Sequence, residues 1–217
     1  MDEVVRNHDI YLGRAAAVFE KAFFTVNIIP DEKPVADERL EQYVFEQVAY
    51  PHVTGTLPED LVRYGMVPTI YPILSRSAGA GFPNVIIDDD GVRRRINLLF
   101  GYDGHYFAQL GFRPLLDWLG NPQITVSDSR IVLQNAVLPG AEEPRRITIP
   151  FTPDHTMLIN WPAKSFVESF RHLSFGKLII HDELFDHLIE NLEVRADWGY
   201  LGAYQGSTPL LDVYAYY

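Results

Sequence analysis

The spacing of apolar residues changes period along this chain, and each period predicts a different kind of element. Residues 9–24 have helical spacing, with Asp9 as a candidate N-cap, and run into an apolar strand at 23–29. Residues 37–50 are helical again, with Asp37 in the capping position. The chain therefore opens with helices that flank a strand.

Short apolar runs at regular intervals occupy the middle of the chain. Before them, residues 51–83 are dense in proline and glycine, and the extended run at 67–74 fits an edge strand or an irregular segment better than a central strand. The later runs are separated by turn-forming residues, which is typical of antiparallel hairpins. A short helical pattern at 111–120 interrupts them. The runs lie at 84–88, 93–102, 105–110, 124–128, 130–138, 146–151 and 155–161.

From residue 165 the helical period returns, and residues 176–217 form a helical and aromatic C-terminal extension in this interpretation. The pattern as a whole predicts an α+β fold: an antiparallel, hairpin-rich sheet with flanking helices and a C-terminal helical segment. The 217 residues suit one domain or at most two.

Composition narrows the classes of function. Acidic residues outnumber basic ones by 29 to 18, which argues against a nucleic-acid partner, because phosphate backbones need a basic face. Cysteine is absent, which excludes disulfides and thiolate catalysis. No apolar run approaches the roughly 20 residues that span a bilayer.

The most heavily charged stretch holds three aspartates, a glycine and three arginines in close succession. Adjacent Asp88, Asp89 and Asp90 lack the alternate spacing of a calcium loop. Asp90–Gly91 and Asp103–Gly104 are instead dipeptides that two-residue hairpin turns prefer, because both central residues need positive φ. The stretch therefore predicts two hairpin turns joined by one strand.

The arginines that follow allow two interpretations. In a strand, Arg93 and Arg95 share one face and Arg94 takes the other. Either the arginines are solvated and pair across the hairpin with Asp88 or Asp89, or Arg94 points inward and binds an anionic ligand or a buried carboxylate.

Other residue types give weaker indications of chemistry. His181 and His187 lie on different faces of a helix, and the HExxH spacing is absent, so we expect no metal site. No nucleophile motif, P-loop or dinucleotide motif is present, so we expect neither a catalytic constellation nor a cofactor. Tyrosines exceed what a core requires, and such side chains serve recognition. The candidate ligand-binding residues are Arg94, Tyr102, His105 and Tyr106.

Residues 81–120 resemble the central signature of the second type of CHASE domain. The family pattern runs G-x-x-N, then D-x-D-G-x-x-R-R, an apolar strand, a short turn with glycine, and a helix. The resemblance extends over roughly 9–185, although the family's glycine before the "LIN" strand is replaced here by "DHTM", and its first and last strands have no counterpart. The matching residues are Gly81, Asn84, Asp88, Asp90, Gly91, Arg94 and Arg95.

Domains of this family are extracytoplasmic sensors attached to adenylate or guanylate cyclases, histidine kinases and related signalling proteins. The resemblance implies that residues 1–217 are a single, non-catalytic sensory domain, excised from a longer bacterial inner-membrane cyclase, with 176–217 as an extension. It implies a periplasmic or extracellular location and a small-molecule or environmental signal. The membrane would be reached through missing flanking segments, and a homodimer is one expected assembly.

Three alternatives stay open. The chain is the sensor of a histidine kinase, or it is a stand-alone hydrolase or carbohydrate-active enzyme with its acids among Asp88, Asp154 and Glu183. The third alternative is an interaction domain that dimerises through 176–217. Two carboxylates about 5–10 Å apart in one pocket would favour the hydrolase.

Overall fold

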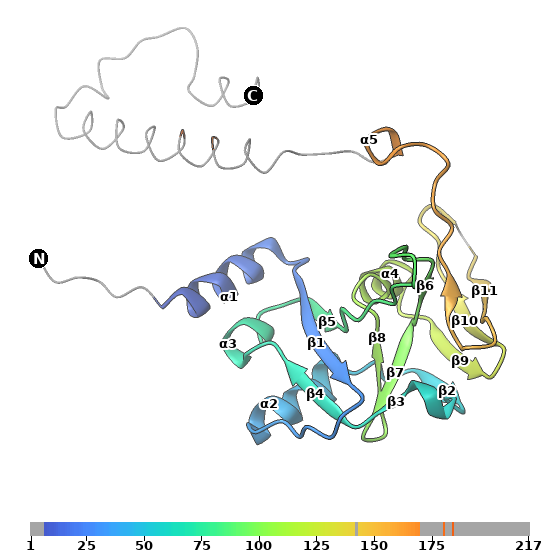
Figure 1. Ribbon diagram of the computed structural model, residues 1–217. Coiled ribbons are helices and arrows are strands. Elements are labelled where there is room, and N and C mark those ends of the chain that lie inside the picture. Colours follow the sequence, from blue (N-terminus) through green and yellow to red (C-terminus); the bar gives the residue numbers. More distant parts are fainter. Residues whose placement is uncertain (1–6, 142, 170–179, 181–183, 185–217) are drawn as a thin grey trace, which may run out of the picture. The chain divides into compact units, whose positions relative to one another are not determined.

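The computed structural model describes residues 7–141, 143–169, 180 and 184 (Figure 1). The chain divides into two units, Met1–Asn160 and Trp161–Tyr217. The helical elements of the first unit are α1 (His8–Phe19), α2 (Glu38–Tyr43), the π-helical turn η1 (Val44–Val48), the 3₁₀ turn η2 (Glu59–Leu61), α3 (Tyr71–Leu74) and α4 (Phe112–Trp118). In the second unit, α5 spans Phe166–Ser169.

Strands of the first unit form several small sheets rather than one. The strands are β1 (Phe23–Ile29), β2 (Val53–Gly55), β3 (Val62–Arg63), β4 (Gly65–Pro68), β5 (Gly79–Gly81), β6 (Arg95–Ile96), β7 (Leu99–Tyr102), β8 (His105–Ala108), β9 (Gln123–Ser127), β10 (Arg130–Ala136), β11 (Arg145–Pro150) and β12 (Met157–Leu158). Their orders are β4-β1-β5, β11-β10-β9-β2, β12-β6 and β3-β7-β8. The predicted α+β class is confirmed.

The predicted antiparallel pairing holds for most strand pairs but not for all, because the sheets are mixed. Strands β2, β3 and β5 pair in parallel with β9, β7 and β1 respectively. All three come from the Pro/Gly-dense region 51–83, where two- or three-residue strands leave no alternation to detect. The run 67–74, expected to be an edge strand or an irregular segment, contributes its first two residues to β4, the edge strand beside β1, and its last four form α3.

Two hydrophobic clusters fill the first unit. One gathers β1, β4, the α2–η1 region and the β7–β8 hairpin around Ile28, Phe82 and Phe107, which are all buried. The other packs α4 against β9 and β10 around Leu116, Ile124 and Ile131. The region 81–110 contributes side chains to both clusters.

Capping residues fix several helix ends. Asp37 caps α2 as predicted, with its carboxylate accepting from the amides of Arg39 and Leu40. The predicted end of α4 is confirmed too, because Gly120 and Asn121 both have positive φ and their amides donate back to Asp117 and Leu116 carbonyls. The prediction that Asp9 caps α1 is wrong, because the side chain of Asn7 accepts from the amide of Ile10 at 3.2 Å.

The two Asp–Gly turns differ from each other. Asp103 and Gly104 have φ of 46° and 73°, which confirms the two-residue turn between β7 and β8. Asp90 does not have positive φ, whereas Gly91 does, at 80°. The amide of Gly91 donates to the Asp88 carbonyl and the amide of Asp88 donates to the Val92 carbonyl, so this loop has three residues with a left-handed glycine at its end.

Predicted strands on both sides of that loop are largely absent. Residues 83–88 and 92–94 lie outside any strand, and regular pairing resumes only at Arg95. Among the described residues, no helix has the length and apolarity needed to cross a membrane.

Candidate functional site

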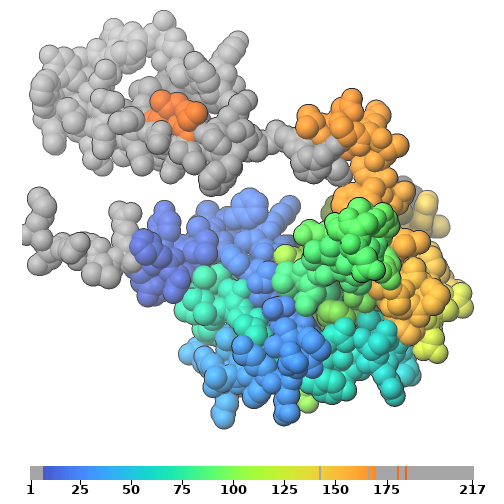
Figure 2. All heavy atoms as spheres, viewed as in Figure 1, coloured from blue at the N-terminus to red at the C-terminus, as the bar shows by residue number. Residues whose placement is uncertain are grey.

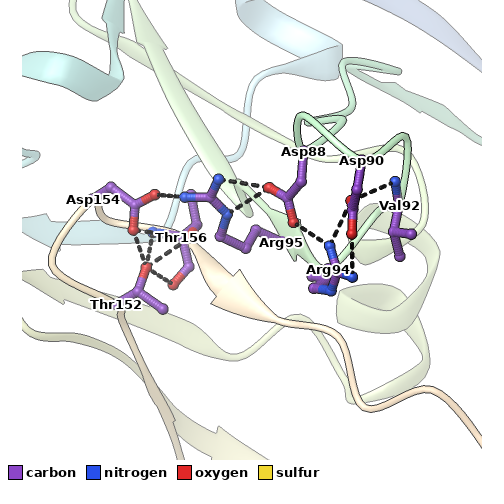
Figure 3. A network of polar contacts seen from close by, with 8 residues as sticks. All are labelled: Asp88, Asp90, Val92, Arg94, Arg95, Thr152, Asp154 and Thr156. Carbon is purple, nitrogen blue, oxygen red and sulfur yellow. Dashed lines mark hydrogen bonds and ion pairs between the residues drawn. The ribbon is translucent and has the colours of Figure 1, made fainter.

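Five charged side chains from two distant segments meet at one place on the first unit (Figure 3). We call this group the Asp–Arg clasp; its members are Asp88, Asp90, Arg94, Arg95 and Asp154. The first four lie in and beside the loop 88–92, and the fifth lies between β11 and β12. The clasp therefore joins two loops that are far apart in the sequence.

Arg94 is held by the loop that precedes it. Its Nη1 donates to Asp90 Oδ1 at 2.8 Å and its Nη2 donates to Asp90 Oδ2 at 2.6 Å, a two-pronged pairing of guanidinium and carboxylate. Nη1 also donates to Asp88 Oδ2 at 3.2 Å. With 48% of its side chain exposed, Arg94 is an outward residue, so the interpretation that it points inward is wrong. The expected pairing with Asp88 is observed, but the two-pronged partner is Asp90, which was not predicted.

Arg95 connects the two loops. Its Nε and Nη2 donate to Asp88 Oδ1 at 3.1 and 2.6 Å, and its Nη1 donates to Asp154 Oδ2. Alternation along a strand would send Arg94 and Arg95 to opposite faces, but both reach Asp88. They do so because residues 92–94 are not in a strand, which frees the backbone from alternation.

These contacts lower the pKa of every clasp carboxyl group. Hydrogen bonds from Arg95 and then Arg94 lower the pKa of Asp88. A hydrogen bond from Arg94, aided by the amide of Val92, lowers the pKa of Asp90 to about 2. The pKa of Asp154 is lowered mainly by the hydroxyl of Thr152. The three carboxylates therefore stay ionised at neutral pH, opposite two permanently charged guanidinium groups.

The loop that carries Asp154 is itself tightly organised. The hydroxyl of Thr152 contacts that of Thr156 at 2.6 Å and accepts from the amide of Thr156 at 3.2 Å. Next to Asp154, His155 has a φ of 52° and places Nδ1 2.8 Å from Asp60 Oδ1 in η2. Side chains thus hold this loop from two directions, Arg95 on one side and Asp60 on the other.

Backbone pairing adds to the clasp at its centre. Strand β12 pairs antiparallel with β6, with Leu158 opposite Arg95, and the amide of Ile159 donates to the Arg94 carbonyl at 2.8 Å. The first unit ends at Asn160, directly after this pairing. The clasp therefore fastens the last strand of the first unit to the segment that carries the two arginines.

A shallow hollow of about 520 Å³ lies over the clasp, lined by Ile87, Asp88, Asp89, Asp90, Arg94, Arg95 and Leu158. In this lining, the carboxylates of Asp88 and Asp90 are engaged with the guanidinium groups of the two arginines. Asp88 and Asp154 bind the same guanidinium group, so neither has the raised pKa of a general acid. This geometry does not favour the hydrolase alternative; its third acid, Glu183, lies outside the described residues.

The other candidate ligand-binding residues lie together on the β7–β8 hairpin. Tyr102 pairs with His105 across the turn, and Tyr106 is next to His105. The three line a hollow of about 280 Å³ with Leu57, Gly101 and five other residues. Arg94 lies instead at the hollow over the clasp. The structure thus brings three of the four candidates together.

Aromatic stacking holds the β7–β8 hairpin against η1. The imidazole of His105 stacks on Phe45 of η1, with ring centres 4.1 Å apart and planes 8° from parallel, and its Nδ1 lies 2.8 Å from the Asp103 carbonyl oxygen. Burial raises the pKa of Tyr102, whose phenol stays neutral at physiological pH. The hollow therefore presents ordered aromatic groups that suit recognition of a small ligand.

Sequence reasoning missed several of these residues. Phe45 and Leu57 carry no signal that links them to the hairpin, since apolar residues in a helix and a loop suggest only packing. The Thr152–Asp154–Thr156 spacing is a signal of a side-chain-stabilised turn that the sequence does contain. Within the described residues, no group of three histidine, aspartate or glutamate side chains is arranged to hold a metal ion.

Comparison with known proteins adds one match. The family model of the CHASE2 domain matches residues 9–195. The matched range covers most of the chain and extends ten residues beyond the resemblance over 9–185. No curated protein and no solved structure matches the chain.

Proposed function

The chain belongs to the CHASE2 domain family, and we propose that it is the signal-sensing input domain of a membrane-bound adenylate or guanylate cyclase. CHASE2 domains are extracytoplasmic sensory domains found in cyclases and kinases, and they are not themselves catalytic. The cyclase output, the membrane attachment and the ligand site are our proposals.

The observation that supports a signalling role is the position of the clasp. Sensors need an element with two arrangements whose balance the signal shifts. The clasp holds β12 by side chains that lie on the surface, and β12 is the last strand before the boundary at Asn160. We propose that the clasped and released states of β12 are the two arrangements, and that the signal favours one of them.

We place the signal at the hollow of Tyr102, His105 and Tyr106. It lies on strands β7 and β8, and β7 begins three residues after the end of β6, the partner of β12. A ligand that shifts the hairpin would therefore act on β6 through a very short connection. Arg94 belongs to this proposal as part of the clasp, where an anionic ligand would compete with Asp90 for its guanidinium group.

The test begins with the complete reading frame that encodes this chain. The proposal requires a cyclase catalytic domain and membrane-spanning segments in the same protein. A histidine-kinase domain in their place would change the output but keep the sensor assignment. A frame that encodes these 217 residues and nothing else would overturn both.

The second step measures cyclic nucleotide formation by the full-length protein in membranes. Arg95→Ala removes the link between Asp88 and Asp154, and we expect it to change basal output several-fold. The matched control is Arg146→Ala on β11, which removes an equally charged, exposed side chain away from the clasp. Equal output from both variants would contradict the role proposed for β12.

A further inference from the structure

Helix α1 exposes its large side chains and buries its small ones. Gly13 and Ala16 are the buried residues of this helix. A Cβ on Gly13 would lie 2.3 Å from the carbonyl oxygen of Pro72, so α1 approaches the backbone of α3 through its smallest residue. A helix seated on a body normally turns its large apolar residues inward. Here that arrangement is reversed.

The exposed side of α1 is a continuous apolar stripe. We call it the α1 stripe; its members are Tyr11 (67% exposed), Leu12 (47%), Ala15, Val18 (85%) and Phe19 (69%). Spacings of three, four and seven residues place them along one side of the helix. Figure 2 shows α1, in dark blue, at the molecular surface beside α3. A seam of this kind is the surface that helices use to pair with other helices.

A hole for a partner's side chain adjoins the stripe. Asn7, Ile10, Tyr11 and Arg14 line a hollow of about 430 Å³. Their positions are i, i+3, i+4 and i+7, which is the set of four residues that accepts a knob from a facing helix. The hollow is thus a second observation that points to a helix as the occupant.

We propose that the α1 stripe is a self-association surface, on which α1 of a second copy of this chain packs antiparallel, centred on Ala15. This inference does not depend on the nature of the output domain. It commits to a second copy because the stripe complements itself in that orientation. Tyr11 then lies opposite Phe19 of the partner subunit, and Leu12 lies opposite Val18 of the partner subunit. The knob over the hollow of Ile10 and Arg14 is Phe19 of the partner subunit.

The helix dipole favours the antiparallel orientation over the parallel one. Antiparallel packing brings the N-terminal end of each α1 helix beside the C-terminal end of the other, so opposite partial charges meet at both ends of the pair. In a parallel pair, helix ends with the same partial charge would lie side by side, which disfavours that orientation.

The surface available suits a weak dimer. The exposed fractions correspond to about 500 Å² of side-chain surface per subunit, or roughly 1,000 Å² in the pair, at the lower end for specific interfaces. We therefore expect a dissociation constant of about 1–100 µM for the chain in solution. Attachment to a membrane would raise the local concentration and favour the pair.

Cysteine cross-linking tests the geometry, because the chain contains no cysteine. In the antiparallel pair Ala15 meets its own copy, so Ala15→Cys should form a disulfide-linked dimer under mild oxidation. Val18→Cys should not, because its copies are offset by about 9 Å along the helix axis. Asp128→Cys, in the β9–β10 turn, measures random collision. Efficient cross-linking of Val18→Cys would overturn the antiparallel register.

Sedimentation equilibrium tests the surface with two matched leucines. Leu12 on α1 is 47% exposed and Leu115 on α4 is 41% exposed. We expect Leu12→Ser to weaken the dimer at least tenfold and Leu115→Ser to leave it unchanged. A chain that is monomeric at 200 µM, or a dimer that Leu12→Ser does not weaken, would overturn the proposal.

Discussion

The Asp–Arg clasp and the α1 stripe are both surface features of the first unit, but they differ in whether their side chains have partners within the molecule. In the clasp, each carboxylate and guanidinium group has partners within the molecule. In the stripe, Val18 and Phe19 expose most of their surface. The charged stretch, which looks most like a binding site in the sequence, pairs its charges within the molecule. The apolar side chains of α1, an ordinary helix in the sequence, are left exposed to solvent.

The largest effect on stability is expected from a substitution where α1 packs closely against α3. Gly13→Ala adds a Cβ that would lie 2.3 Å from a backbone oxygen, so α1 or α3 must shift. We expect a loss of about 1–3 kcal/mol in the free energy of unfolding, despite the higher helix propensity of alanine. Urea unfolding monitored by circular dichroism measures it.

The control for this substitution is Gly111→Ala at the start of α4. Its added Cβ would meet the side-chain oxygen of Gln109, at 3.1 Å, but no backbone atom, so we expect a clearly smaller loss than for Gly13→Ala. If Gly13→Ala were as stable as the parent, α1 would not be held by close backbone approach. The stripe could then turn inward, and the contrast with the clasp would disappear.

An intermediate effect is expected in the loop that anchors the clasp. Thr156 is 2% exposed and its hydroxyl pairs with that of Thr152. Thr156→Ala removes this buried hydroxyl and leaves the part-buried hydroxyl of Thr152 with one partner fewer, so we expect a loss of about 1–2 kcal/mol in the free energy of unfolding. Thr148→Ala, at an exposed position of β11, is the control and should be nearly neutral. A cost no greater than that of the control would show that the loop does not depend on this pairing.

The smallest effect should be the response of the clasp to acid. A carboxyl group whose pKa is lowered by folding stabilises the fold above its unfolded pKa of about 3.9, and this contribution is lost as pH falls through the folded value. For Asp90 that value is about 2, and the pKa values of Asp88 and Asp154 are lowered too. We therefore expect the clasp to loosen below pH 4 and its Asp90 pair to open near pH 2.

Carboxyl carbon chemical shifts followed by NMR would measure this titration. In Arg94→Gln the pKa of Asp90 should return toward the unfolded value, because its largest cause of lowering is gone. The α1 stripe should not respond over this range, which sharpens the contrast between the two regions. Titration of Asp90 near pH 4 in the parent protein would contradict the ion pair.

Local chemistry made parts of this fold predictable. The Asp37 cap, the Asp103–Gly104 turn and the end of α4 at Gly120 each depend on residues within a few positions of one another. The loop at 88–92 was harder, because an Asp–Gly dipeptide serves both a two-residue turn and a three-residue loop. What decides between them is pairing along the flanks, and residues 92–94 do not pair as a strand.

Long-range pairing limited prediction of the candidate site. Arg95 and Asp154 are 59 residues apart, and no local pattern indicates their contact. The grouping of Tyr102, His105 and Tyr106 was predictable in part, because a two-residue turn brings its flanking residues face to face. Phe45, which stacks on His105, comes from η1 and could not be placed there before the fold was known.

Strand β5 has a mechanical consequence. It pairs with β1, and a Cβ on Gly81 would lie 2.7 Å from both the Ala108 carbonyl oxygen and the Leu110 Cα, so two backbones touch with no side chain between them. Directly after it, the amide of Phe82 donates to the Ala108 carbonyl. A joint without side chains has no rotamers with which to absorb a displacement. A displacement of the β7–β8 hairpin should therefore be transmitted to β1 as a rigid-body shift, rather than be absorbed by side-chain rearrangement in the core.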